Sequence, residues 1–135
     1  MISRRFGVTS LYVFGSRALE IAARCSGQGS VEGTPALADV DIAVQPAVGA
    51  LAAAWDRVAL ADELEKLLQV SRVDLVILTE TGAFLAADAI RGELLYCEDE
   101  GRQSREELYY LRRAGDLAPL QHQRLRSLLT GDLHR

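Results

Sequence analysis

Three short apolar runs, separated by stretches with helical periodicity, constrain the fold of this 135-residue chain most strongly. The runs extend over Ser10 to Phe14, Asp39 to Val44 and Val73 to Leu78, and β-branched, aromatic and aliphatic residues dominate them. Runs of this length and composition are typical of strands that pack inside a domain. Strands that alternate with helices predict an α/β or α+β fold, in which a small sheet is flanked by helices.

The segments that follow the first two strands carry the pattern of helices. Arg17 to Cys25 combines strong helix formers with apolar residues at helical spacing, and Ser16 is a favourable N-cap residue. Leu51 to Leu68 has apolar residues at three- and four-residue steps, which predicts an amphipathic helix. The expected apolar face of that helix consists of Trp55, Val58, Leu60, Ala61, Leu64, Leu67 and Leu68.

Three further segments continue the expected order of elements. Ser26 to Ala36 contains glycines, serines and a proline, which is loop composition, so we expect a loop extension at about 26–37. Ala83 to Arg91 predicts a short helix stopped by Gly92, and Leu94 to Tyr96 a last brief strand.

The C-terminal part of the chain predicts two helices at about 104–129. They extend over Ser104 to Arg113 and over Pro119 to Leu129, with a break at Gly115. Ser104 followed by Glu107 three residues later has the signature of a capping box at the start of the first helix.

Composition and charge restrict the class of protein. The chain is 49% hydrophobic and 25% charged, which is typical of one soluble domain over residues 1–135. It has no apolar run long enough to span a bilayer and no signal-peptide pattern, so we expect a cytoplasmic protein without a membrane role. Cys25 and Cys97 have neither disulfide-framework nor zinc-site spacing. A net charge of −4 without a basic stripe argues against direct binding to duplex DNA.

Three aspartates in the strands are the most informative polar residues. Asp74 lies inside an apolar run, where an unpaired charge is costly unless it is neutralised or coordinates a cation. Asp39 and Asp41 are two residues apart on a strand, so both carboxylates point to the same face. A divalent cation relieves the repulsion of such a pair, and oxygen ligands of this kind suit Mg²⁺.

The turn after the first strand has the chemistry of a phosphate site. Gly15 lets a phosphate approach the backbone, and Ser16 offers a hydroxyl and free N–H groups at the start of a helix. Arg17 could contact a phosphate through two hydrogen bonds. Together with the three aspartates, this turn predicts phosphoryl or nucleotidyl transfer.

Each part also has an ordinary structural interpretation. An Asp-x-Asp pair often lies on the solvated face of a strand, and a strand that ends in Gly-Ser before a helix is a common turn. Asp74 could simply be paired with a nearby arginine. The conjunction of all three features favours the functional interpretation.

The motifs resemble those of the minimal nucleotidyltransferases, small relatives of the polymerase-β nucleotidyltransferase superfamily. The resemblance is carried in chain order by Phe14-Gly15-Ser16-Arg17-Ala18, Ala38-Asp39-Val40-Asp41-Ile42 and Val73-Asp74-Leu75-Val76. It continues through Gly92-Glu93-Leu94-Leu95-Tyr96 to Asp116-Leu117-Ala118-Pro119 and therefore covers most of the chain.

The resemblance implies a nucleotidyltransferase fold and a role for each motif. Gly15 and Ser16 would bind the β and γ phosphates of ATP, and Asp39 and Asp41 would ligate two Mg²⁺ ions. Asp74 would complete the metal site and help to deprotonate the attacking hydroxyl.

The sequence departs from the family pattern in two segments outside the motifs. The connection from Ser16 to Asp39 is longer than is usual. The segment before the first strand, Met1 to Gly7, is short, which would uncover a surface for a partner or a second copy in a homodimer.

The resemblance further implies transfer of AMP from ATP to a hydroxyl group of a protein. The protein would then be the antitoxin of a toxin–antitoxin pair. Its target would be a tyrosine of a helical HEPN-domain toxin encoded by a neighbouring gene. Two alternatives remain open: a non-catalytic antitoxin that acts by contact, and a small-molecule nucleotidyltransferase of the aminoglycoside-modifying kind. The latter enzymes generally carry a second helical domain, for which this chain has little room.

Overall fold

The computed structural model describes residues 2–16, 18–25 and 39–130, with side chains for all of these except 24, 25 and 118–130. Its elements are α1 (Ile2–Phe6), β1 (Val8–Phe14), α2 (Ala18–Cys25), β2 (Asp39–Pro46), α3 (Ala54–Leu68), β3 (Arg72–Ile77), the 3-10 turn η1 (Leu78–Glu80), α4 (Ala83–Ile90), β4 (Glu93–Cys97) and α5 (Glu100–Thr130). Arg17 and the predicted loop extension, Ser26 to Ala36, lie outside the described residues.

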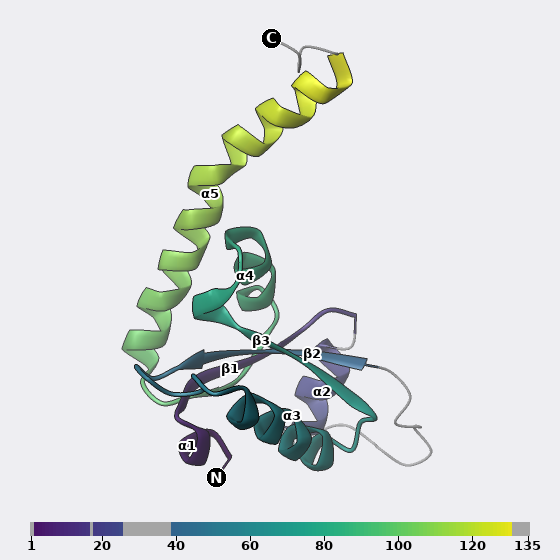
Figure 1. Cartoon of the computed structure of the whole chain (residues 1–135), viewed down its shortest axis with the longest axis vertical. Coiled ribbons are helices and arrows are strands. Elements are labelled where there is room, and N and C mark those ends of the chain that lie inside the picture. Colours follow the sequence, from purple (N-terminus) through teal and green to yellow (C-terminus); the bar gives the residue numbers. More distant parts are fainter. Residues whose placement is uncertain (1, 17, 26–38, 131–135) are drawn as a thin grey trace.

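The four strands form one mixed sheet in the order β3-β2-β1-β4. Strand β1 is antiparallel to both of its neighbours, whereas β2 and β3 are parallel. Helices α2 and α3 lie on one side of the sheet, and α4 lies on the other side together with the first part of α5 (Figure 1). The predicted α+β fold, a small sheet flanked by helices, is therefore confirmed.

The core has one layer on each side of the sheet, as the strand patterns predict. Val40, Ile42 and Val44 alternate along β2 and belong to the layer beneath α2 and α3. Ala43, between them, and Tyr12 of β1 belong to the second layer, beneath α4 and α5. Because the odd-numbered residues of β2 face α4 and α5, Asp39 and Asp41 lie on this same face of the sheet.

Helix α3 is shorter than predicted and buries a narrower stripe. It begins at Ala54 rather than Leu51, because Leu51 adopts a positive φ of 58° before the helix. The buried side chains Leu60, Leu64 and Leu68 follow a single i, i+4 row. Trp55, which the sequence places on the apolar face of this helix, is not part of the core, because the residue is 83% exposed. Val58 and Leu67 are exposed as well.

The C-terminal segment is one helix, so the prediction of two helices with a break at Gly115 is wrong. Helix α5 starts at Glu100, because Asp99 Oδ1 accepts hydrogen bonds from the backbone N–H groups of Gly101 (3.0 Å) and Arg102 (3.4 Å). The capping box predicted at Ser104 consequently lies inside the helix. A glycine in a helix costs about 1 kcal/mol, which is too little to interrupt a helix anchored elsewhere.

That anchor is a set of hydrogen bonds between α5 and the sheet. The Tyr12 hydroxyl donates to Glu107 Oε2 (3.1 Å) and accepts from Gln103 Nε2 (2.8 Å). The Tyr110 hydroxyl donates to Gln45 Oε1 at 2.5 Å. Burial raises the pKa of Tyr110 to about 12 and also raises the pKa of Tyr12, so both hydroxyls remain protonated donors at neutral pH.

Helix α5 continues beyond the sheet and away from the rest of the molecule (Figure 1). Although it contains 31 residues, neither α5 nor any other helix in the described part of the chain is long and apolar enough to cross a membrane.

Candidate nucleotide and metal site

The three predicted aspartates meet at one end of the sheet. In the parallel pair β2 and β3, Asp41 lies opposite Asp74, and Asp39 lies opposite Arg72. Residues two apart on a strand share a face, so all four side chains lie on the face that α4 and α5 cover farther along. We call Asp39, Asp41 and Asp74 the acidic cluster.

The glycine turn lies directly against this cluster. Phe14, the last residue of β1, pairs with Asp41, and Gly15 follows with a φ of +85°. A Cβ atom built on Gly15 would come within 2.7 Å of Asp41 Oδ2, so the carboxylate packs against the glycine backbone. The chain then turns into α2, with the Ala18 N–H donating to the Gly15 carbonyl at 3.2 Å. Ser16 is exposed beside the turn.

The pKa of Asp41 reflects both its partial burial and the like charges around it. The pKa of Asp41 is raised above its ordinary value, mainly by burial and further by the charges of Asp74 and Asp39. Asp41 and Asp74 are partly buried, whereas Asp39 is exposed. The repulsion that the sequence spacing predicts between Asp39 and Asp41 is therefore present in the fold, and Asp74 adds to it.

Arg72 is a charged neighbour that the sequence interpretation did not single out. Its Nη2 atom lies 3.1 Å from Asp74 Oδ1, so Asp74 does have an arginine partner, as the ordinary interpretation of that residue proposed. The available signal was the spacing, because residues 72 and 74 share one face of a strand. The pair places one positive charge beside the three carboxylates.

Two residues outside the glycine turn and the acidic cluster hold the strands in place. Glu65 of α3 accepts a hydrogen bond from the Val73 N–H at 2.9 Å and another, through its carbonyl, from the Val70 N–H at 3.1 Å. These bonds secure the start of β3 beside Asp74. At the other edge, a Cβ atom on Gly92 would come within 2.3 Å of the Val13 carbonyl oxygen, so only glycine lets β4 approach the end of β1.

The residues fit a metal ion that arrives with phosphate better than a metal held by protein alone. Within residues 2–16, 18–25 and 39–130, no three His, Cys, Asp or Glu side chains form a group that could hold a metal ion by themselves. Mg²⁺ usually keeps water ligands and is bound through one or two carboxylates together with the phosphates of a substrate. Two carboxylates on one strand and a third opposite them, next to a glycine turn, provide a donor set of this kind.

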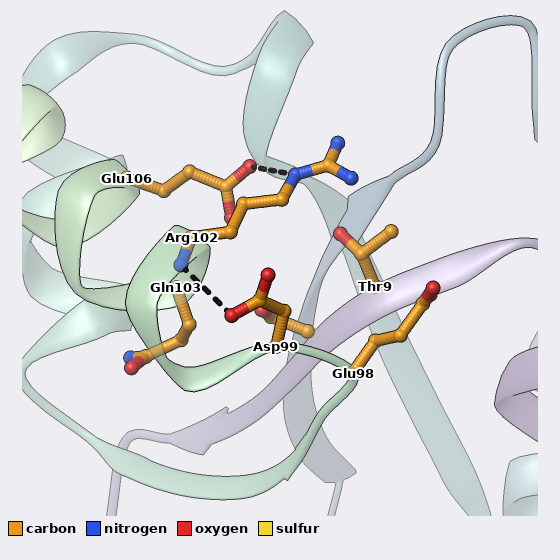
Figure 2. Close-up of a pocket in the computed structure, with 7 residues that line it drawn as sticks. Thr9, Glu98, Asp99, Arg102, Gln103 and Glu106 are labelled. Carbon is orange, nitrogen blue, oxygen red and sulfur yellow. Dashed lines mark hydrogen bonds and ion pairs between the residues drawn. The ribbon is translucent and has the colours of Figure 1, made fainter.

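A separate polar pocket of about 80 Å³ lies at the other end of β1. Its lining residues are Thr9, Ser10, Glu98, Asp99, Arg102, Gln103 and Glu106. Figure 2 shows the side chain of Arg102 turned toward Glu106, and its Nε donates to Glu106 Oε2 at 3.3 Å. The pocket is far smaller than the ~300–1,000 Å³ of typical ligand sites, so it does not compete with the acidic cluster as a nucleotide site.

Comparisons with known proteins agree with the geometry. The sequence profile described as "Polymerase beta, Nucleotidyltransferase" matches residues 1–101, which include the glycine turn and all three aspartates. No curated protein sequence matches the chain significantly.

Several solved structures share the fold at low sequence identity. An MntA–HpeT toxin–antitoxin mutant has a TM-score of 0.61 at 20% identity, covering 99% of this chain and 93% of the other. A toxin–antitoxin structure with AMP-PNP has a TM-score of 0.58 at 21% identity, with coverages of 99% and 94%. A tri-AMPylated HEPN toxin in complex with an MNT antitoxin, from Shewanella oneidensis, has a TM-score of 0.58 at 21% identity, with coverages of 99% and 91%.

Proposed function

We propose that this chain, which belongs to the polymerase beta nucleotidyltransferase family, transfers AMP from Mg²⁺·ATP to a hydroxyl group of a protein partner. The single observation that carries the proposal is the contact between the Gly15 turn and Asp41, within a cluster of three carboxylates. A turn that exposes backbone to a phosphate and an acidic cluster suited to a divalent cation are the two parts that nucleotidyl transfer requires.

In the proposed reaction, the hydroxyl oxygen of the acceptor attacks the α phosphorus of ATP. A new oxygen–phosphorus bond forms, the bond from the α phosphorus to the bridging oxygen breaks, and pyrophosphate leaves. Asp74 accepts the hydroxyl proton, while Gly15 and Ser16 hold the β and γ phosphates. Bound Mg²⁺, held by Asp39, Asp41 and Asp74, would supply charge stabilisation to the phosphates and the attacking oxygen.

We propose a HEPN-domain toxin as the partner and one of its tyrosines as the acceptor, so that this chain acts as an antitoxin. Support comes from the relatives of similar fold, which include an MNT antitoxin in complex with a tri-AMPylated HEPN toxin. Further support comes from the extent of these matches, which cover 99% of this chain and 93% and 91% of the two solved chains.

A contact-only antitoxin is the second candidate function. The Arg72–Asp74 ion pair favours this function, because it gives the Asp74 carboxylate a positively charged partner without a metal ion. The close placement of Asp41 opposite Asp74 and beside Asp39 favours the enzyme instead, because repulsion between carboxylates brings nothing to a protein that acts only by contact. A small-molecule nucleotidyltransferase has no comparable observation in its favour.

The deciding experiment uses the Asp74→Asn variant with labelled ATP, Mg²⁺ and the helical protein encoded by the adjacent gene. The side chains are nearly isosteric, so we expect the fold and ATP binding to persist. AMP transfer should fall about 10²- to 10⁴-fold, because the general base is lost. Asp62→Asn is the matched control, since Asp62 is an exposed α3 residue paired with Lys66. If both variants neutralise the partner as well as wild type and no AMP appears on it by mass spectrometry, the contact-only function is correct.

A further inference from the structure

We propose that Arg72 acts as the counter-ion of the acidic cluster in the absence of metal. Its guanidinium pairs with Asp74 until a divalent cation binds together with a nucleoside triphosphate and displaces the guanidinium. Metal binding would thereby depend on the nucleotide. The inference deepens the proposed function, because it concerns how the same site is loaded.

The position of Arg72 follows from the strand register. It lies opposite Asp39 across the parallel pair β2 and β3, and two residues before Asp74 on the same face. Its guanidinium contacts Asp74 Oδ1 at 3.1 Å. The guanidinium therefore contacts one carboxylate of the cluster, on a residue whose strand position lies opposite a second one, so it competes with a metal ion for Asp74.

The geometry of the acidic cluster favours a cation beside it in the absence of metal. Asp41 lies opposite Asp74 across the parallel pair and two residues from Asp39 on the same face, and like charges at the spacing of neighbouring strands repel each other. Four arginines form ion pairs elsewhere: Arg5 with Glu63, Arg57 with Glu80, Arg91 with Asp88 and Arg102 with Glu106. Arg72 contacts the acidic cluster instead, through Asp74.

The contact is also weak enough to be exchanged. The side chain of Arg72 is 67% exposed and that of Asp74 is 39% exposed, and ion pairs between such exposed groups contribute little to stability. A divalent cation carries twice the charge, and the triphosphate that accompanies it supplies both additional ligands and an anion for the released guanidinium. A metal ion alone offers neither compensation and has to compete with Arg72 for Asp74.

The test measures binding of Mn²⁺, as a spectroscopic substitute for Mg²⁺, by electron paramagnetic resonance without nucleotide. Arg72→Gln should bind Mn²⁺ about fivefold more tightly than wild type, because the competing cation is gone. Arg72→Lys keeps a cation at this position and should remain near the wild-type affinity. Thermal unfolding shows whether Arg72→Gln folds. If it does not, Arg72→Met is used in its place.

The matched control is Arg5→Gln. Arg5 is similarly exposed, at 61%, and paired with Glu63, but it belongs to α1 at the opposite end of β1. This substitution makes the same change in net charge and should leave Mn²⁺ affinity unchanged. An equal gain in both variants would reduce the effect to overall charge and overturn the proposal.

Two other results would overturn it as well. Unchanged or weaker Mn²⁺ binding by Arg72→Gln would show that Arg72 does not compete for Asp74. Loss of binding to a non-hydrolysable ATP analogue, with Mn²⁺ affinity unchanged, would make Arg72 a phosphate ligand instead. Tighter Mn²⁺ binding without any AMP transfer by wild type would support the counter-ion and reject the proposed transfer reaction, so the two failures are distinguishable.

Discussion

Replacing Asp41 by asparagine should make the metal-free protein more stable. The substitution keeps the shape that packs against Gly15 but removes the charge that burial, Asp74 and Asp39 all disfavour. At the spacing of neighbouring strands, about 5 Å, two like charges repel by ~0.8 kcal/mol in water and ~3 kcal/mol near a protein surface. Solvent screens part of this repulsion because the cluster is only partly buried, so we expect a gain of about 1 kcal/mol in the free energy of unfolding.

The sign of the pH dependence follows from the raised pKa of Asp41. The folded protein binds this proton more tightly than the unfolded chain, where the pKa has its ordinary value of 3.8. Wild-type stability should therefore fall as pH rises from about 3.8 through the folded-state pKa. Below that window Asp41 is neutral in both states and the advantage of Asp41→Asn disappears; above it the advantage is complete.

The assay is thermal unfolding at pH 7 with a chelator present, where a gain of about 1 kcal/mol raises the melting temperature by about 4 °C. Addition of Mg²⁺·ATP should reverse the order, because ligand binding stabilises only the protein that still binds the ligand. The control is Asp62→Asn, which should change stability by less than about 0.5 kcal/mol. A metal-free Asp41→Asn variant no more stable than wild type would refute the account of the cluster as a site of unrelieved repulsion.

Three glycine substitutions test the fold around and beyond the site. Gly15→Ala should lower the free energy of unfolding by about 2 kcal/mol and weaken Mg²⁺·ATP binding, because alanine is strained at a φ of +85° and its Cβ would meet Asp41 Oδ2 at 2.7 Å. Gly82→Ala, whose Cβ would meet nothing within 4 Å, should be nearly neutral in the same denaturation experiment. Gly115→Ala should raise stability by about 0.5–1 kcal/mol, since its Cβ also meets nothing and alanine favours a continuous helix. No gain in stability or in helical circular dichroism from Gly115→Ala would favour a broken helix after all.

The sequence predicts well those features that depend on neighbours a few residues away. Strand alternation places Asp39 and Asp41 on one face whatever the strand pairs with, because successive side chains of a strand point to opposite sides. In the same way, a strand that ends in Gly15-Ser16 and continues into helix formers predicts the turn found between β1 and α2. The role of Arg17 and the course of the segment before Asp39 stay predictions, since they lie outside the described residues.

Helix ends and exposed faces are less predictable, because several weak local signals compete there. Asp99 rather than Ser104 caps α5, and packing of Tyr110 and Ala114 against the body outweighs the helix-breaking tendency of Gly115. The apolar pattern of α3 likewise does not indicate that Trp55 remains in solvent, because the angle at which a helix meets a sheet is a tertiary property.

Only the tertiary structure decides which charges meet. Asp41 and Asp74 are separated by a whole helix in the chain, and it is the parallel pairing of β2 and β3, in one register out of several, that sets them side by side. The same register puts Arg72 opposite Asp39, and the antiparallel partner β1 brings Gly15 against the Asp41 carboxylate. The residue types and their faces are thus local properties of the sequence. The position of Arg72 opposite Asp39 and the raised pKa of Asp41 depend on packing between distant segments, because a slip of one residue would turn a strand's side chains to the opposite face.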